Sequence, residues 1–319
     1  TPDTGGWQNG TTMTNPAVSI GAGSGQVLRI EFSGGGDFNI NWFEFSSDGT
    51  STDATYTAVS SGDWSAPATW QGGNVPTDGA EVFIQDDVTV TVTEPISTRV
   101  TYVDVAGTLR HASDRDSKLR VETIETRPGS KYEVGTESSP IQREVTAELE
   151  FIDQGPIDES EWPDRENKGL IGQGAIEIVG AAKTPWTTLA RAPTTGDSSI
   201  DLSTEPTNWS VGDTIVIPGL ECYTSTSLDN KDEKRTISSI SGTTVTFDTA
   251  LEYDHVPPET DLDTFVLNLT RNARFFSESS DERRYGHVML GAPGATVKYL
   301  ETVNIGRTDK GRDVTDPLW

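Results

Sequence analysis

The chain of 319 residues contains one cysteine, two methionines and three histidines. The lone Cys222 excludes an internal disulfide framework, so the fold must depend on burial of apolar side chains. No segment approaches the roughly 20 apolar residues that a membrane helix needs, and no signal peptide opens the chain. We therefore expect a piece of a larger protein, with no transmembrane segment in this part.

Basic residues are also scarce, because 24 Lys and Arg stand against 50 Asp and Glu and give a formal charge of −26. Nucleic acid is not an expected partner, since its phosphates require basic patches. The acidic residues are scattered along the chain, which is typical of a surface that works at high salt, where self-repulsion is screened. Calcium capture at a cell surface is the alternative interpretation of this acidity.

What the sequence has in quantity is turn residues, with 31 Gly and 17 Pro. The stretch from Trp64 to Gly107 places a Trp64/Trp70 pair and a Gly-Gly turn before alternating Val and Thr at Val88 to Val92. Such alternation puts apolar side chains on one face of a strand and polar ones on the other. The sequence therefore predicts an all-β fold.

Several ordered blocks in this stretch resemble the G-eight (eight-glycine) domain, an extracellular module of the type found in fibrocystin and the cell-migration-inducing hyaluronan-binding protein. The matching blocks are Trp64-x5-Trp70-Gln71-Gly72-Gly73-x-Val75-Pro76, Gly79-x2-Val82-x-Ile84, Val103-x-Val105-x-Gly107-x-Leu109 and Tyr132-x-Val134-Gly135-Thr136-Glu137-x2-Pro140. The resemblance assigns residues 58–180 to this domain.

Apolar positions inside the domain recur at the interval that one coil of a parallel β-helix requires. Val103, Ile124 and the run from Val145 to Leu149 are about 20 to 25 residues apart, and so are Gly107 and Gly129. We expect a right-handed parallel β-helix, with the charged loop 153–168 projecting from it.

Residues 1–45 resemble the C-terminal part of a family 6 carbohydrate-binding module, through TGGWQNG, a VLRIEF strand and NINWFEF. The resemblance implies a partial β-sandwich in which Trp7 stacks on a sugar ring and Asn39 hydrogen-bonds the sugar. The alternative is that Trp7 belongs to the core and Asn39 is a polar residue at a strand end. The Ser, Thr, Asp and Gly of residues 46–57 predict a linker.

The remaining chain predicts two further β parts. Residues 181–257 contain a Gly-Asp turn before the strand to Ile217 and a Ser241-Gly242-Thr243 turn, which favour a small β-barrel-like insertion. Residues 258–319 predict further, truncated coils. Their expected strands are Val266 to Leu269, Val288 to Leu290, Val297 to Leu300 and Val303 to Ile305.

Few residues point to chemistry. We predict His287 and Arg284 as catalytic candidates, since an Arg beside a His can hold a carboxylated sugar, and a hydrogen-bonded structural His287 is the alternative. His111 and His255 are expected to be structural. Calcium is the only cofactor the sequence suggests, because Asp114-x-Asp116 and Asp229-Asn230-x-Asp232 resemble calcium loops, although solvated turn carboxylates explain them as well. Sequons at Asn9, Asn208 and Asn268 permit glycosylation.

These observations favour a carbohydrate-binding or adhesion region of an extracellular or cell-surface protein, in a halophilic organism, with a polysaccharide or glycan as partner. The alternative is a polysaccharide-degrading enzyme, a hyaluronidase-like glycosidase or lyase, whose catalytic coils lie partly beyond residue 319. A purely structural acidic stalk is the third interpretation.

Overall fold

The computed structural model describes residues 56–156, 167–220, 231–259 and 261–306. Within these ranges the regular structure consists of β-strands and three short 3-10 helices. The predicted sandwich of residues 1–45, with Trp7 and Asn39, lies outside the described residues. So do Asn9, Cys222 and most of the predicted linker and of the loop 153–168.

Sixteen parts of the chain form parallel sheets, in which nearly all neighbours come from successive circuits of the chain. The strands are β1 (Tyr56–Ala58), β2 (Gly62–Asp63), β3 (Glu81–Ile84), β4 (Thr89–Val92), β5 (Val100–Val105), β6 (Thr108–His111), β7 (Ser117–Thr126), β8 (Lys131–Val134), β9 (Ala147–Phe151), β10 (Gly169–Gly172), β11 (Ala175–Val179), β18 (Ala273–Ser277), β19 (His287–Leu290), β20 (Thr296–Lys298) and β21 (Leu300–Val303). The long β7 counts twice, because its two halves pair with different strands.

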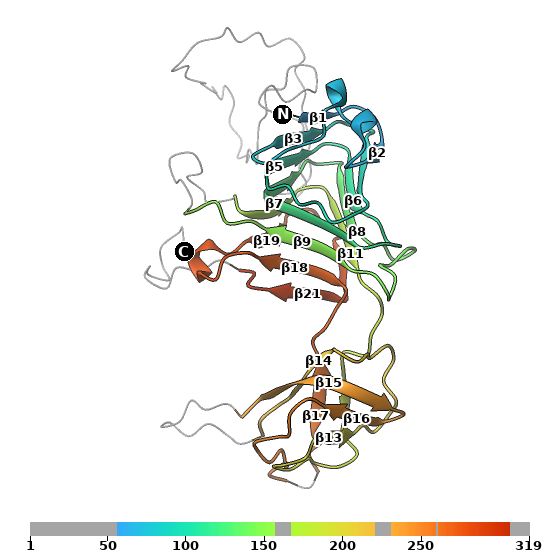
Figure 1. Ribbon diagram of the computed structural model, residues 1–319, viewed down its shortest axis with the longest axis vertical. Helices are drawn as coiled ribbons and strands as arrows, with labels where there is room; N and C mark the ends of the chain where they lie inside the picture. Colours follow the sequence, from blue (N-terminus) through green and yellow to red (C-terminus); the bar gives the residue numbers. More distant parts are fainter. Residues whose placement is uncertain (1–55, 157–166, 221–230, 260, 307–319) are drawn as a thin grey trace, which may run out of the picture. The chain divides into compact units, whose positions relative to one another are not determined.

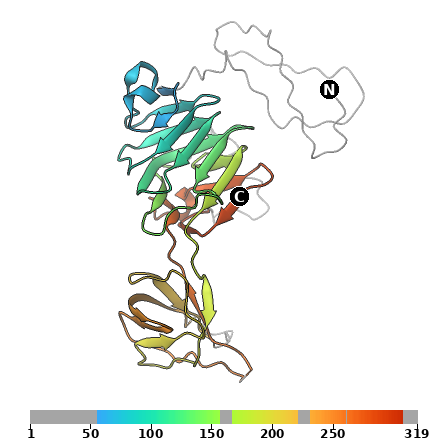
Figure 2. The same ribbon diagram turned by 90° about the vertical axis from the view of Figure 1, so that its right-hand side faces the viewer.

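We name the three rows of parallel strands A, B and C (Figures 1 and 2). Row B consists of β1, β3, β5, the second half of β7, β10 and β19. Row C consists of β2, β4, β6, β8, β11 and β20. Row A consists of the first half of β7, β9, β18 and β21. The chain alternates between rows B and C from β1 to β4 and visits the rows in the order B, C, A from β5 onward, so each circuit stacks on the previous one.

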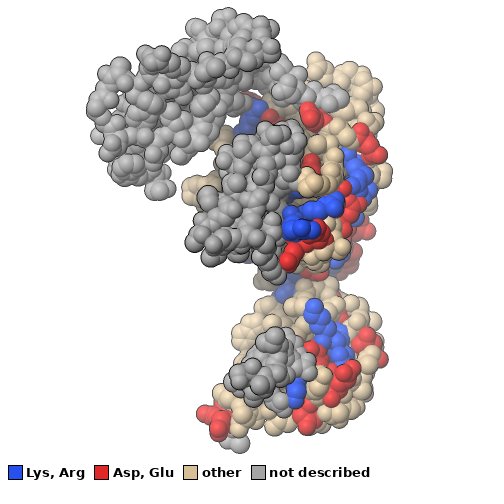
Figure 3. Space-filling view, turned by 90° about the vertical axis from the view of Figure 1, so that its left-hand side faces the viewer, with Lys and Arg blue, Asp and Glu red and all other residues tan. Residues whose placement is uncertain are grey.

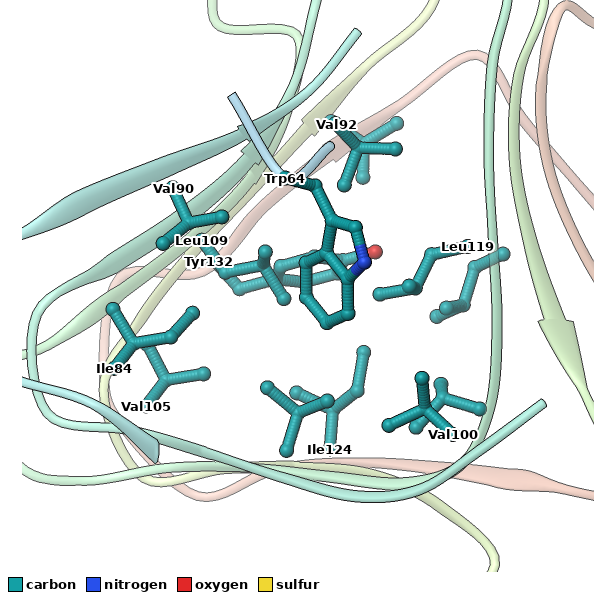
Figure 4. Packing of buried hydrophobic residues seen from close by; sticks show 14 of the residues in the cluster. Trp64, Ile84, Val90, Val92, Val100, Val105, Leu109, Leu119, Ile124 and Tyr132 are labelled. Carbon is teal, nitrogen blue, oxygen red and sulfur yellow. The ribbon is translucent and has the colours of Figure 1, made fainter. Parts of the chain in front are cut away.

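Strand alternation explains why these segments stack. Val82, Val103 and Ile124 are in register on row B, and Val90 and Leu109 are in register on row C. All five are buried. The side chains between them point outward, because successive residues of a strand face opposite sides. Figure 4 shows the resulting core, in which aliphatic side chains from different circuits meet.

Trp64 lies over the centre of this core in Figure 4 and is 1% exposed. Its ring meets that of Trp70 edge to face, with centroids 5.2 Å apart. Trp70 Nε1 donates to the Trp64 backbone oxygen at 2.7 Å. The short 3-10 helices η1 (Pro67–Thr69) and η2 (Gln71–Gly73) flank Trp70 and hold it there. The Trp pair that stands out in the sequence is therefore a core feature.

The outer side of row A carries charges of alternating sign. Lys118, Glu148, Arg274 and Glu301 are in register across four strands. Arg274 Nη1 lies 2.7 Å from Glu148 Oε1, and its Nε lies 3.5 Å from Glu301 Oε1. Figure 3 shows basic side chains beside acidic ones on the described surface. These charges satisfy one another, so row A is not the most suitable binding face.

A separate six-stranded antiparallel sheet, which we call the module, is inserted into the fifth circuit between β11 and β18. Its strands, in spatial order, are β12 (Trp186–Thr188), β17 (Phe265–Asn268), β14 (Thr214–Ile217), β15 (Glu233–Ser241), β16 (Thr244–Phe247) and β13 (Ser199–Asp201). Ile215, Ile217, Val245 and Val266 belong to its own apolar core. The predicted Gly242 turn is present, with Gly242 at φ +58° between β15 and β16.

Three placements differ from the expectations. The segment Val266 to Leu269 was expected in a coil, but β17 pairs with β12 and β14 of the module, since its buried Val266 completes that core. The run Val145 to Leu149 lies on row A, where Leu149 pairs with Leu119 rather than with Val103 or Ile124. The predicted linker ends before residue 56, because β1 pairs with β3.

Candidate functional site

The outer side of row C is hollowed into a groove of about 560 Å³. Strands β2, β4, β6 and β8 supply its walls together with the segments that follow β6 and β8. Its lining residues are Asp63, Thr91, Thr93, Arg110, His111, Ala112, Ser113, Asp114, Arg115, Glu133, Gly135, Thr136 and Ser139. Most of these side chains carry hydroxyl, carboxylate or guanidinium groups, so the groove is strongly polar.

The strand register creates a ladder of outward polar residues along this groove. Asp63 pairs with Thr91, Thr91 with Arg110, and Arg110 with Glu133. Thr91, Arg110 and Glu133 each follow a buried apolar residue on their strands, and Asp63 precedes the buried Trp64, so alternation turns the ladder residues outward. Arg110 Nε donates to Thr91 Oγ1 at 3.0 Å, which fixes the guanidinium over β4. The ladder thus presents one polar side chain for each circuit of the chain.

The segment after β6 forms one side of the groove. Arg115 Nε lies 3.0 Å from Asp114 Oδ1, and this hydrogen-bonded pair lowers the pKa of Asp114 and raises the pKa of Arg115. Ser113 Oγ lies 3.0 Å from Ser139 Oγ and ties this segment to the one after β8. Both charged side chains of the pair are solvent-exposed, so they can rearrange around a ligand.

Gly135 allows the segment after β8 to turn close to the next strand. Its φ is +71°, which favours glycine, and a Cβ there would lie 2.3 Å from the backbone oxygen of Val179. The chain then runs past Thr136 to Ser139, whose backbone nitrogen donates to Thr136 Oγ1 at 3.0 Å. Glycine is therefore part of what shapes this wall of the groove.

His111 is among the groove-lining residues, but its side chain is buried and its ring contacts core residues. Its Nδ1 lies 3.0 Å from Ser117 Oγ and its Nε2 lies 3.1 Å from Tyr132 Oη. Burial lowers the pKa of His111 to about 3, because the charged imidazolium would lose its hydration there. His111 is therefore a neutral structural residue near neutral pH.

A second, smaller hollow of about 80 Å³ lies further along row C. It shares Glu133 with the ladder, and Glu177 and Thr296 extend the register beyond Glu133. Lys131 Nζ lies 3.9 Å from Glu133 Oε1. The polar surface of row C therefore continues over six strands, from β2 to β20.

The predicted pair His287 and Arg284 lies elsewhere. His287 begins β19 on row B, in the register position that Tyr102 and Thr123 occupy on β5 and β7. Arg284 ends the 3-10 helix η3 (Glu282–Arg284), and its Nε donates to Asp153 Oδ1 at 2.9 Å. The two predicted residues are near each other in sequence, but they do not line the groove.

Asp153 explains how Arg284 is held. Burial acts to raise the pKa of Asp153, but hydrogen bonds from the Gly155 backbone and from Arg284 outweigh it, and the pKa is lowered. The carboxylate therefore stays charged and keeps the guanidinium occupied. An Arg that is already bound in this way is poorly placed to hold a sugar carboxylate.

The remaining predicted residues have structural partners. His255 is fully buried, with Nδ1 2.8 Å from the Pro218 oxygen and Nε2 3.0 Å from Glu233 Oε1. Asn268 is buried as well, and its Nδ2 donates to Asp213 Oδ2 at 2.8 Å. The Asn268 sequon is therefore closed to glycosylation in the folded chain. Asn208 Nδ2 donates to the Ala182 oxygen at 2.7 Å.

The acidic strings do not form calcium loops in the part of the chain that the structure describes. Asp114 pairs with Arg115, Asp116 Oδ1 accepts from the Thr146 backbone nitrogen, and Asp232 Oδ1 accepts from that of Gly219. Asp229 and Asn230 lie outside the described residues. Among the described residues, no group of three or more His, Cys, Asp or Glu is placed to hold a metal ion.

The ladder of row C was missed in the sequence. The strand register is the signal that could have revealed it. Leu109 and Tyr132 are apolar positions separated by one coil, so they are expected to pair inside the stack. The residues that follow them, Arg110 and Glu133, must then lie side by side on the outer face. Histidines and closely spaced aspartates stand out more readily in a sequence, but they do not form the ladder. In a stacked β-fold, residues that cooperate are separated by one circuit rather than by two or three positions.

Fold and groove together define an all-β protein of stacked parallel strands with a polar groove along one row. Residues 69–190 match the G8 domain, so the chain contains this domain, as the sequence resemblance predicted. The match covers β3 to β12 and includes most of the groove.

Two curated relatives are similar. Fibrocystin-L of Homo sapiens is 28% identical over 197 residues, which are 60% of this chain and 4% of the relative. A G8 domain-containing protein of Dictyostelium discoideum is 23% identical over 238 residues, which are 72% of this chain and 16% of the relative. The chain therefore spans a small part of the length of both.

Two solved structures were also matched. The tailspike of Acinetobacter baumannii bacteriophage AP22, in complex with A. baumannii capsular saccharide, has a TM-score of 0.24 and 15% identity, covering 62% of this chain and 29% of its own. The tailspike of Pseudomonas phage phi297 has a TM-score of 0.25 and 12% identity, covering 63% and 29%. No helix among the described residues is long and apolar enough to cross a membrane.

Proposed function

We propose that this chain is a glycan-binding, adhesive region of an extracellular or cell-surface protein, and that the groove of row C holds the glycan. The observation that carries the proposal is the ladder Asp63, Thr91, Arg110 and Glu133 inside a groove of about 560 Å³. The G8 domain supports the extracellular setting through the resemblance to extracellular modules.

The chemistry of the lining suits sugar hydroxyls. Hydroxyl groups both donate and accept hydrogen bonds, and the groove offers donors from Arg110 and Arg115, acceptors from Asp63 and Glu133, and hydroxyls that do both. A few convergent polar groups of this kind fix the orientation of a small ligand. The mixture of signs favours a neutral or mildly acidic glycan over a highly charged polyanion, which a chain of −26 would repel at low ionic strength.

The spacing of the ladder also suits a linear polysaccharide. Neighbouring strands of a sheet lie about 4.8 Å apart, which is comparable to the length of one pyranose unit in an extended chain. A polysaccharide that runs along the stack would therefore meet one outward side chain per sugar. We further propose that the winding is that of a right-handed parallel β-helix, which the strong preference for right-handed crossovers between parallel strands supports.

The test is the replacement Arg110→Ala in the full chain. We expect it to weaken binding to polysaccharide about tenfold, because a charge-assisted hydrogen bond at the centre of the groove is lost. Retardation in native gels that contain hydroxyethyl cellulose, laminarin, galactomannan or xylan measures this. Arg191→Ala is the matched control, since Arg191 is an exposed arginine of the module. Equal retardation of the Arg110→Ala and Arg191→Ala variants would reject the groove as the binding site.

The other sequence-based predictions stand beside this proposal. We retain the domain division as a prediction, with β17 moved to the module and β1 to the parallel sheets, together with the sugar contacts of Trp7 and Asn39 and the halophilic origin. The enzyme alternative also stays a prediction about a longer protein. His287 lies on row B, and Arg284 lies in η3, where Asp153 binds it, so the geometry favours binding over catalysis.

A further inference from the structure

An aromatic pair lies exposed on the antiparallel module. Trp186 on β12 is 55% exposed and Phe265 on β17 is 37% exposed. Their ring centroids lie 5.6 Å apart, with the planes at 67°. The two rings therefore form an open corner, which keeps ring surface of both residues in contact with solvent. Exposing a tryptophan to this degree costs hydrophobic stabilisation that burial would supply.

The register places this pair in a wider outward strip. Trp186 pairs with Leu267, which in turn pairs with Val216 on β14, while Phe265 pairs with Thr188. Each of these residues is partly or largely exposed, whereas the intervening Val266 is fully buried. The module core is therefore complete without the aromatic pair. Packing within the module does not explain why these positions are aromatic.

The charge of the strip indicates what can bind there. Strands β12, β14 and β17 contain no charged residue. Across the sheet from Trp186, the paired residues are Leu267 and Val216, and the first charged residue is Lys234 on β15. In a chain with a formal charge of −26, this uncharged strip suits an uncharged ligand. A second copy of the chain is disfavoured, because association would bring two strongly acidic molecules together.

We propose that Trp186 and Phe265 form a second glycan contact, on a module that is distinct from the groove. The apolar C–H face of a pyranose stacks on the Trp186 ring, and the Phe265 ring contacts the sugar from the side. Thr188, which lies on the same strand as Trp186 and pairs with Phe265, offers a hydroxyl to hydrogen-bond the sugar. The class of ligand is a neutral polysaccharide. The choice of a glycan rests on the proposed function, but the site itself does not depend on the groove.

The experiment compares four variants of the full chain: Trp186→Ala, Phe265→Ala, Val211→Ala and Arg110→Ala. Val211 is the control, because it is an exposed apolar residue of the module at a turn and is not part of the strip. The probes are hydroxyethyl cellulose, laminarin, galactomannan and xylan. Native-gel retardation gives the affinity, and sedimentation velocity gives the oligomeric state. We expect Trp186→Ala to lose about tenfold in affinity and Phe265→Ala a few-fold, with Val211→Ala unchanged.

The outcomes separate the two sites. Loss of retardation in Trp186→Ala and not in Arg110→Ala supports the aromatic site and contradicts the groove. Loss in Arg110→Ala alone overturns the aromatic site and leaves the groove. If wild-type chain is not retarded by any of the four polysaccharides, the aromatic site is overturned. A change from dimer to monomer in Trp186→Ala without a change in retardation assigns the strip to protein association and also overturns the inference.

Discussion

Replacing Trp64 by alanine is expected to lower the free energy of unfolding by about 3–5 kcal/mol, the usual cost of truncating a large aromatic side chain in a core. Trp64 is almost fully buried, and its ring lies over the aliphatic side chains of several circuits. Alanine would leave a cavity that the parallel strands cannot close, because hydrogen bonds on both sides hold their spacing. Urea denaturation followed by circular dichroism measures the loss.

Trp186→Ala is the matched control for this prediction. The two residues are chemically identical, but Trp186 is largely exposed and its loss should change stability by no more than about 0.5 kcal/mol. A third variant, Trp64→Phe, should cost less than alanine, because it fills part of the cavity and removes Nε1, which has no hydrogen-bond partner in the described chain. A cost below about 1 kcal/mol for Trp64→Ala would mean that the ring is not part of the core.

Acid should destabilise the chain through His111, and this is the second large effect. The pKa of buried His111 is lowered to about 3, against 6.5 for an ordinary histidine. Above pH 6.5 the side chain is neutral in both states and its contribution to stability is complete. As the pH falls from 6.5 to 3, only the unfolded chain takes up the proton, so the free energy of unfolding falls. The slope is about 1.4 kcal/mol per pH unit, or about 5 kcal/mol in all.

The comparison of wild type with His111→Gln isolates this term. The variant is expected to be less stable at neutral pH, since it disturbs the contacts with Ser117 and Tyr132. Its stability should nevertheless fall less steeply with acid. Between pH 6 and 4 we expect its slope to be smaller than that of the wild type by about 1.4 kcal/mol per pH unit. Tyr132→Phe is the control, because it removes one partner and keeps the histidine. Parallel pH profiles for wild type and His111→Gln would show that His111 is not buried as described.

The sequence was sufficient to predict β-structure and the coil interval. Alternation at Val88 to Val92 predicted β4, and the distance from Val103 to Ile124 is one circuit, because the two residues pair directly. Both signals arise from the backbone: strand alternation has a period of two, and a stacked circuit must return to the same row. The all-β architecture and its parallel sheets are confirmed on these grounds.

The sequence was not sufficient to assign each strand to its row. Leu149 follows Ile124 at the expected interval but lies on row A, because the chain passes through row A before it returns to row B at β10, where Leu170 pairs with Ile124. Val266 has the same apolar pattern as a coil strand and belongs to the module. A buried strand in a parallel stack and one in an antiparallel sheet look alike in sequence, since both alternate. The groove was missed for the same reason, because the alignment of Arg110 with Glu133 depends on the register.

The most direct measurement of the central proposal, that row C binds glycan, is hydrogen–deuterium exchange of the full chain with and without a polysaccharide that retards it. We predict slower exchange in peptides that cover 110–115 and 133–139, where the groove walls contain backbone amides outside the strand ladders. Residues 284–287, which run from the end of η3 to the start of β19 and do not line the groove, should be unchanged. Protection confined to that segment, or an exchange pattern in which 110–115 and 133–139 do not respond, would contradict the proposal.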